Sequence, residues 1–416
     1  MAPKRRSLFV FGTAGAVVVG AAILLGSAAK SSAVRLPSGD AEVLEHVPSG
    51  AADPRERERA QLQRLLAARP ADRRTALALA RLDIELSRAR SDPRYLGYAQ
   101  AALGPWWKLE EPPADVLVLR ATIRQSSHDF EGALDDLNHV LASNPGDAQA
   151  WLTRSVVLTV QGRYDQGKAS CAPLARLTTP LVFAVCETSI DALSGAAGPA
   201  YDRLAAALTE SGRVSPRGQG DADQAYEADE KEWATSTLGE IALRLGHDAD
   251  AERAFRAALA IEPGDSYVLG AFADLLLDDG RAREAADLVR DRTENDALLL
   301  RLVLAEVASR AKQAEPHAAL LASRFDASHL RGDTVHRREE ARFLLSVRDD
   351  APAALALARA NWSVQREPWD VRILLESALA ARSPAAAAEA VAFVREHGLQ
   401  DPRIDALVAK FAPVKP

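Results

Sequence analysis

The chain of 416 residues has few of the residues that build disulfide-rich or metal-dependent folds. It contains two cysteines and one methionine, which is the initiator. Two cysteines exclude a framework of several disulfides and any zinc site made of four cysteines. A single methionine excludes a methionine-rich copper site.

Aromatic residues are also scarce, at 5% of the chain, although hydrophobic residues make up 48%. Much of the apolar content is alanine and leucine, in runs such as residues 353–360 and 384–392. Strands are enriched in β-branched and aromatic residues, whereas small apolar residues let helices approach closely. The composition therefore predicts an all-α fold.

An excess of positive charge is missing as well. Lys and Arg total 51 against 58 Asp and Glu, which gives a formal net charge of −7. Proteins that bind nucleic acid usually carry clustered positive charge that attracts the phosphate backbone. We therefore expect no nucleic acid among the partners.

The first 29 residues differ from the rest of the chain. Lys4, Arg5 and Arg6 precede an uncharged, mostly apolar stretch over residues 8–25, and small residues follow at 26–29. Basic residues stay in the cytoplasm while an apolar segment enters the bilayer, so residues 1–29 are predicted to be a signal peptide or a membrane anchor. The stretch is near the lower limit of a spanning helix and longer than a usual signal core, so both interpretations stay open.

Residues 5–9 also resemble a twin-arginine export signal. Each export interpretation places the chain beyond the first 29 residues outside the cytoplasm. Residues 30–54 contain several Pro, Ser and Gly residues and are predicted to be a linker, and residues 412–416 a short tail. We expect a protein of the cell envelope that is either membrane-anchored or exported to the periplasm.

Internal repeats occupy most of the remaining chain. Residues 232–263 read as two helical segments with a turn at residues 246–248, and residues 115–145 have the same form. The copies share a small residue in the first helix, an alanine early in the second, and a proline that closes the unit. The matching residues are Leu238, Gly239, Ala251, Phe255, Ala258 and Pro263 in the clearest copy, and Ala121, Ala133 and Pro145 in the earlier one.

These positions resemble the tetratricopeptide repeat, a helix–turn–helix unit of about 34 residues. The resemblance implies that the small residues are the points where helix A and helix B of a unit touch, and that the proline starts the next unit. Weaker copies extend the array to about nine helix pairs over residues 55–411. The sequence predicts a right-handed α-solenoid, one elongated array, interrupted by a rigid aromatic connector at residues 104–113 and a polar loop at residues 212–229.

No convergent set of catalytic residues is apparent in the sequence. The eight histidines lack metal-ligand spacing such as His-Glu-x-x-His, and no Gly-x-Ser-x-Gly motif is present. We therefore expect no catalysis, no cofactor and no metal. An enzyme whose residues are scattered over the inner face of the array is the remote alternative.

The two cysteines fall on neighbouring helix pairs of the predicted array. Cys171 lies on helix B of one unit and Cys186 on helix A of the next, and these surfaces face each other in a stacked solenoid. In an oxidising compartment the two could form a disulfide. The alternative is a pair of buried thiols that act as small hydrophobic side chains.

The expected binding face is the inner wall, which helix A of each unit lines. Its candidate residues are aromatic and acidic, which suits a basic or amphipathic peptide, although the same residues could be merely solvated helix faces. We expect an interaction scaffold or assembly factor for a protein or peptide partner, attached to the membrane through the N-terminal segment. A soluble exported factor is the alternative. The candidate residues are Trp233, Glu240, Tyr267, Asp274 and Asp278.

Overall fold

A computed structural model describes residues 54–90, 92–213, 221–332 and 336–411, without the side chains of residues 221–225. The predicted signal or anchor at residues 1–29, nearly all of the 30–54 linker and the 412–416 tail lie outside the described residues. Every regular element in the described ranges is a helix, as the composition predicts. None of these helices is long and apolar enough to cross a membrane.

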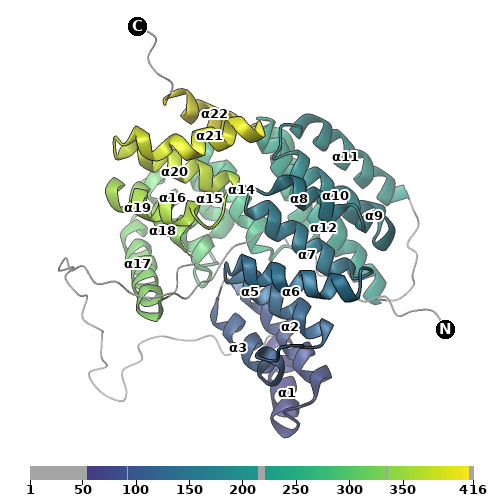
Figure 1. Ribbon diagram of the computed structural model, residues 1–416. Coiled ribbons are helices and arrows are strands. Elements are labelled where there is room, and N and C mark those ends of the chain that lie inside the picture. Colours follow the sequence, from purple (N-terminus) through teal and green to yellow (C-terminus); the bar gives the residue numbers. More distant parts are fainter. Residues whose placement is uncertain (1–53, 91, 214–220, 333–335, 412–416) are drawn as a thin grey trace, which may run out of the picture.

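Nine helix pairs follow one another along the described part of the chain (Figure 1). We call the first member of each pair helix A and the second helix B. The pairs are α2 (Arg73–Arg90) with α3 (Arg94–Ala102), α5 (Ala114–Ser126) with α6 (Phe130–Ser143), α7 (Ala148–Val160) with α8 (Tyr164–Cys171), α10 (Pro180–Asp191) with α11 (Ala197–Arg213), α12 (Asp221–Arg244) with α13 (Asp248–Ile261), α14 (Ser266–Asp278) with α15 (Ala282–Val289), α16 (Asp296–Ser309) with α17 (Ala314–Arg331), α18 (Arg337–Ser346) with α19 (Ala351–Trp362), and α20 (Pro368–Ala380) with α21 (Ala388–His397).

Shorter or unpaired helices complete the array. They are α1 (Pro54–Ala68), α4 (Gly104–Trp107), α9 (Leu174–Leu177), the 3-10 helix η2 (Pro384–Ala387) and α22 (Pro402–Ala409). Both predicted interruptions of the array, at residues 104–113 and 212–229, are therefore partly helical. The connector contains the single turn α4, and residues 221–229 of the expected polar loop begin α12. The sequence of this second segment alternates acidic residues with Ala and Gln, and Ala, Gln and Glu favour helix.

Side-chain caps set the start of several helices A. Asp147, Asp265 and Asn295 precede α7, α14 and α16, and each side chain accepts a hydrogen bond from the backbone N–H three residues later. Such caps satisfy one of the donors that the first turn of a helix leaves without a partner. Each capping residue directly follows the turn that ends the preceding unit. The caps therefore fix where helix A of the next unit begins.

The repeat residues lie where helix A meets helix B. A Cβ atom at Gly239 of α12 would be 2.7 Å from the Phe255 ring of α13, so only a residue without a side chain fits there. Ala251 and Ala258 are fully buried, as are Ala121 and Ala133 in the earlier unit. The tetratricopeptide-like interpretation of the helix pairs is confirmed.

The array closes on itself, so the expectation of an elongated array is wrong. One hydrophobic core contains residues 152–204 together with residues 341–407. The Arg366 backbone N–H donates to the Val160 carbonyl at 2.8 Å, and the Ala197 N–H donates to Gln400 Oε1 at 3.1 Å. The Tyr164 ring at the start of α8 lies against the Phe393 ring of α21, with the ring centroids 6.0 Å apart. In Figure 1 the yellow helix α21 reaches the teal part of the array. These contacts join turns that are far apart in the sequence, and a repeat period carries no information about them.

Candidate functional site

The inner face of the closed array lines a cavity of about 2300 Å³ that is open to solvent. Helix A of every pair contributes residues to the wall, and so does α22. Side chains of a helix that face one direction recur every three or four residues, so a stack of parallel helices A presents one continuous surface. The cavity is the concave face that the repeat pattern predicts.

All five residues that the sequence analysis selected line this cavity. Trp233 is mostly buried in the wall, and the Tyr267 hydroxyl donates a hydrogen bond to Glu240 across the gap between α12 and α14. Burial raises the pKa of Glu240, and Arg244 one turn later opposes the shift. Glu240 is therefore a member of the wall with partners of its own.

Asp274 forms ion pairs within the protein. Its carboxylate is 3% exposed and forms ion pairs with Arg301 of α16 at 2.8 Å and with Arg342 of α18 at 2.7 Å. Burial alone would raise the pKa of Asp274, but the two guanidinium groups outweigh burial and hold the pKa below its usual value. The charge of Asp274 is thus compensated within the protein.

Asp278 lies one helical turn after Asp274 and has the same role for the next two units. Arg372 of α20 donates both terminal nitrogens to its two oxygens at 2.7 Å, and Arg403 of α22 lies at 2.9 Å. These two aspartates line the cavity, but arginines of the protein itself compensate their charges. The four arginines come from α16, α18, α20 and α22.

A second group of carboxylates at the cavity is not compensated in this way. We call it the acidic rim, and none of its members is among the five residues predicted from the sequence. Its members influence one another: Asp229 lies near Glu85 and Glu262, and Glu232 lies near Asp265. Three members are exposed at the surface and all of them line the cavity. The acidic rim consists of Glu85, Asp229, Glu232, Glu262 and Asp265.

Glu232 shows how strongly the rim concentrates negative charge. Burial raises its pKa to about 8, and Asp265, Asp229 and Glu262 add to the shift by repulsion. Its Oε1 atom is buried and makes no hydrogen bond. Burial raises the pKa of Glu85, and Arg88 and Arg55 oppose that shift. Groups of like charge disfavour their own ionisation, and a cation placed among them relieves the repulsion.

The sequence contained a weak signal for this rim. Glu262 and Asp265 flank the Pro-Gly pair of the turn that closes one unit, and Asp229 and Glu232 lie one turn apart. Their proximity depends on the stacking of α12 beside α14, so spacing along the chain could not show it.

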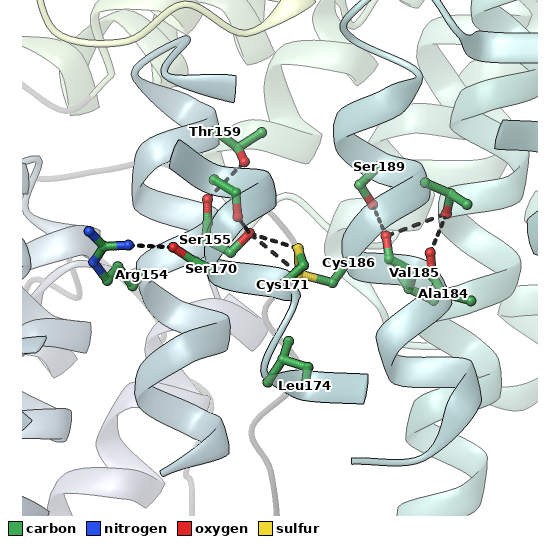
Figure 2. Close-up of a disulfide and its surroundings, with 12 residues drawn as sticks. Arg154, Ser155, Thr159, Ser170, Cys171, Leu174, Ala184, Val185, Cys186 and Ser189 are labelled. Atoms are coloured by element: carbon green, nitrogen blue, oxygen red, sulfur yellow. Dashed lines mark hydrogen bonds between the residues drawn. A yellow bond between two sulfur atoms is a disulfide. The ribbon is translucent and has the colours of Figure 1, made fainter. Parts of the chain in front are cut away.

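Cys171 and Cys186 form a disulfide (Figure 2). The bond joins the last residue of α8 to α10, with a Cα–Cα distance of 5.8 Å. Both sulfur atoms belong to buried residues, and the Ser155 hydroxyl of α7 lies 3.2 Å from Cys171 Sγ while it donates to the Gly167 carbonyl. Of the two interpretations that the sequence left open, the structure has the bridge.

Among the residues that the structure describes, no group of three or more His, Cys, Asp and Glu side chains is arranged to hold a metal ion. The carboxylates of the acidic rim therefore do not form a metal centre of that kind. They place several acidic groups in a cavity whose wall also contains apolar residues, including the partly exposed side chains of Leu177 and Ile261.

Comparison with known proteins gives fold-level likenesses only. No family model and no curated protein matches the sequence. A tetratricopeptide repeat protein from Parabacteroides merdae is 13% identical with a TM-score of 0.36, covering 72% of this chain and 98% of that chain. The human IFIT1 dimer with m7Gppp-AAAA is 11% identical with a TM-score of 0.44, covering 86% and 87%.

A Rap protein complexed with competence and sporulation factor is 13% identical with a TM-score of 0.43, covering 86% of this chain and 93% of that chain. The tetratricopeptide-like description of this chain rests on its own repeat residues and on the helix pairs that they join.

Proposed function

We propose that the protein is a non-catalytic interaction scaffold that binds a peptide segment of a partner protein in the central cavity. The size of the cavity is the observation that carries the proposal. At about 2300 Å³ it exceeds the roughly 300–1,000 Å³ of sites for small molecules. A wall built from helix A of every pair is preformed, so little ordering entropy is lost when a segment binds.

The chemistry of the acidic rim favours a basic or amphipathic segment. Lys and Arg side chains would relieve the repulsion around Glu232, and apolar side chains would cover Leu177 and Ile261. Charge complementarity of this kind increases association rates and selects against acidic partners.

The test compares two fluorescent model peptides on the full chain. One is an amphipathic helix of Lys and Leu, and the other has Glu in place of Lys. We expect the basic peptide alone to raise fluorescence anisotropy, with an affinity that falls as salt rises. At pH 9, above the pKa of Glu232, the variant D229N/E232Q/E262Q removes three rim charges and should weaken binding at least about tenfold, or about 1.4 kcal/mol.

A matched variant removes the same charge elsewhere. Asp165, Glu389 and Glu396 are exposed and do not line the cavity, so D165N/E389Q/E396Q should bind as the wild type does. Equal loss of affinity in both triple variants would mean that net charge acts at a distance, and equal binding of the two peptides would refute the proposed partner class.

We further propose that this scaffold works in the cell envelope, either anchored by the N-terminal segment or exported as a soluble assembly factor. The basic and apolar residues of the N-terminus support this location. The disulfide supports it too, because disulfides persist in oxidising compartments. Fractionation of the native host, with N-terminal sequencing of the mature protein, tests it. A cytoplasmic protein with its N-terminus intact would refute both forms.

A further inference from the structure

The closure of the array is made at the turns between helix A and helix B. In three successive units the turn contains a glycine with positive φ: Gly162, Gly195 and Gly246. Each of these glycines is covered by a different residue of the C-terminal part of the chain, which lies across the three turns. We call these contacts the seam.

The contacts at the seam are tightest at Gly162 and Gly246. A Cβ atom at Gly162 would be 2.7 Å from the Phe393 ring, and one at Gly246 would be 3.1 Å from Pro402. A Cβ atom at Gly195 would be 3.5 Å from the Gly398 carbonyl oxygen. The backbone of the turns therefore packs directly against α21 and the start of α22.

Directional interactions hold the same seam in register. Arg403 of α22 forms ion pairs with Asp248 at 3.0 Å and with Asp278 at 2.9 Å, which tie it to α13 and α14. The Arg366 N–H donates to Val160, and Gln400 accepts from Ala197. Each of these links joins the C-terminal part of the chain to an earlier pair of the array.

The corresponding turn of the next unit has no such cover. Gly280, between α14 and α15, has the same positive φ, yet a Cβ atom there would meet nothing within 4 Å. The glycines are thus needed for backbone conformation in all four turns, but for the approach of the C-terminal residues only at the seam.

The seam also borders the cavity. Asp401, Arg403 and Ile404 line it, as do Val160 and Leu193 on the opposite side of the seam. A displacement of α21 and α22 would therefore open the wall, while the contacts of α20 with α18 and α19 keep the last pair attached to the array.

We propose that α21 and α22 form a clasp that holds the helical array closed, and that the packing of the seam sets the shape of the cavity wall. The clasp does not rest on the proposed function, because local opening of the seam is a property of the free protein. The two proposals can therefore fail independently.

The first test is amide hydrogen exchange of the full chain. Gly162→Ala places a methyl group against Phe393, whereas Gly280→Ala has the same strain from positive φ but no neighbour. Exchange of residues 388–409 through local opening should rise about tenfold more in the first variant than in the second. Equal exchange in the two variants would overturn the proposal.

A second pair of variants tests the clasp without changing the conformation of the turns. It keeps the proposal testable if Gly162→Ala does not fold. Arg403→Ala removes the ion pairs that cross the seam. Arg290→Ala removes a local pair with Asp287 on the exposed surface of α15 and its end. Faster exchange of residues 388–409 in the first variant only supports the clasp, and unchanged exchange in both overturns it.

A cysteine in the cavity wall tests whether the seam sets the shape of the wall. Ser236 lines the cavity and is 5% exposed, and Ser236→Cys would be a free thiol, since Cys171 and Cys186 are disulfide-bonded. Its reaction with N-ethylmaleimide should speed up with Gly162→Ala in the same ratio as hydrogen exchange, and not with Gly280→Ala. Equal labelling rates in the two variants would show that the seam does not shape the wall.

Discussion

Asp274 and Asp278 show how the same residue type can serve a ligand or the fold. They lie on the inner face, where a binding residue is expected, but four arginines from later helices occupy their oxygens. A buried carboxylate needs such partners, because leaving one buried without them costs several kcal/mol. The pattern along the chain placed both residues correctly on the inner face and could not reveal the arginines, which follow at irregular distances.

Glu232 is the residue for which we predict the clearest pH dependence. Its pKa is raised to about 8 in the folded protein, against 4.5 when unfolded, so the folded state binds the proton more tightly. Its contribution to stability is complete below about pH 4.5 and is lost as pH rises toward 8. The loss reaches at most about 1.4 kcal/mol per pH unit.

Gln is uncharged at every pH and has the shape of a protonated Glu. Glu232→Gln should therefore remove the loss of stability at high pH. The free energy of unfolding of the variant, from urea titrations, should exceed that of the wild type more at pH 8 than at pH 5. Glu389→Gln, at an exposed position outside the cavity, provides the comparison. If the difference in free energy of unfolding between the variant and the wild type stays constant with pH, the pKa of Glu232 is not raised in the folded protein.

At the scale of the helical element, the contacts between helix A and helix B were the most predictable part of the fold. Gly239, Ala251 and Ala258 are small because another helix lies against them, and this requirement repeats with each unit. The helical start of α12 was less predictable, since residues 221–229 look like a polar loop until α12 is seen to continue into the wall of the cavity.

Gly239→Ala should therefore destabilise the protein although alanine favours helix. Its methyl group would lie 2.7 Å from the Phe255 ring, and overpacking of this kind costs about 1–3 kcal/mol. Gly97→Ala in α3 meets nothing within 4 Å and should instead stabilise by about 0.5–1 kcal/mol. If the denaturant midpoints of the two variants move in the same direction, the tight contact between Gly239 and Phe255 is contradicted.

The disulfide links two elements that the repeat pattern already stacks. Cys171 and Cys186 are 15 residues apart, and closing a loop of about this size is worth roughly 3 kcal/mol. Cys171→Ser/Cys186→Ser should lower the free energy of unfolding by about that amount under oxidising conditions. A reductant should lower the wild type to the level of the variant and leave the variant unchanged; a variant that still responds to reductant would contradict this assignment.

At the scale of the whole molecule, the sequence indicated helix pairs and their number but not the shape they build. Repeat residues describe contacts between neighbours, whereas closure depends on Gly162, Gly246, Phe393 and Pro402, which contact one another across the array. The cavity follows from closure, so its acidic rim was equally hidden from an analysis of spacing.

Closure should make distant parts of the chain unfold together. Residues within 152–204 and 341–407 share one core although three complete pairs separate them. We expect their denaturation midpoints to coincide when each region is followed by pulsed hydrogen exchange and mass spectrometry. An open solenoid loses pairs from its ends, so earlier unfolding of residues 341–407 in the wild type would contradict a closed array.

The contacts of the turn glycines limit how the number of helix pairs can change in evolution. An open repeat array tolerates duplication or loss of a unit, because each unit touches only its neighbours. Here an added pair between α14 and α20 would shift Phe393 and Pro402 away from Gly162 and Gly246. The number of units between the seam partners is therefore constrained, and homologous chains should vary in length outside this interval, before α7 or after α22.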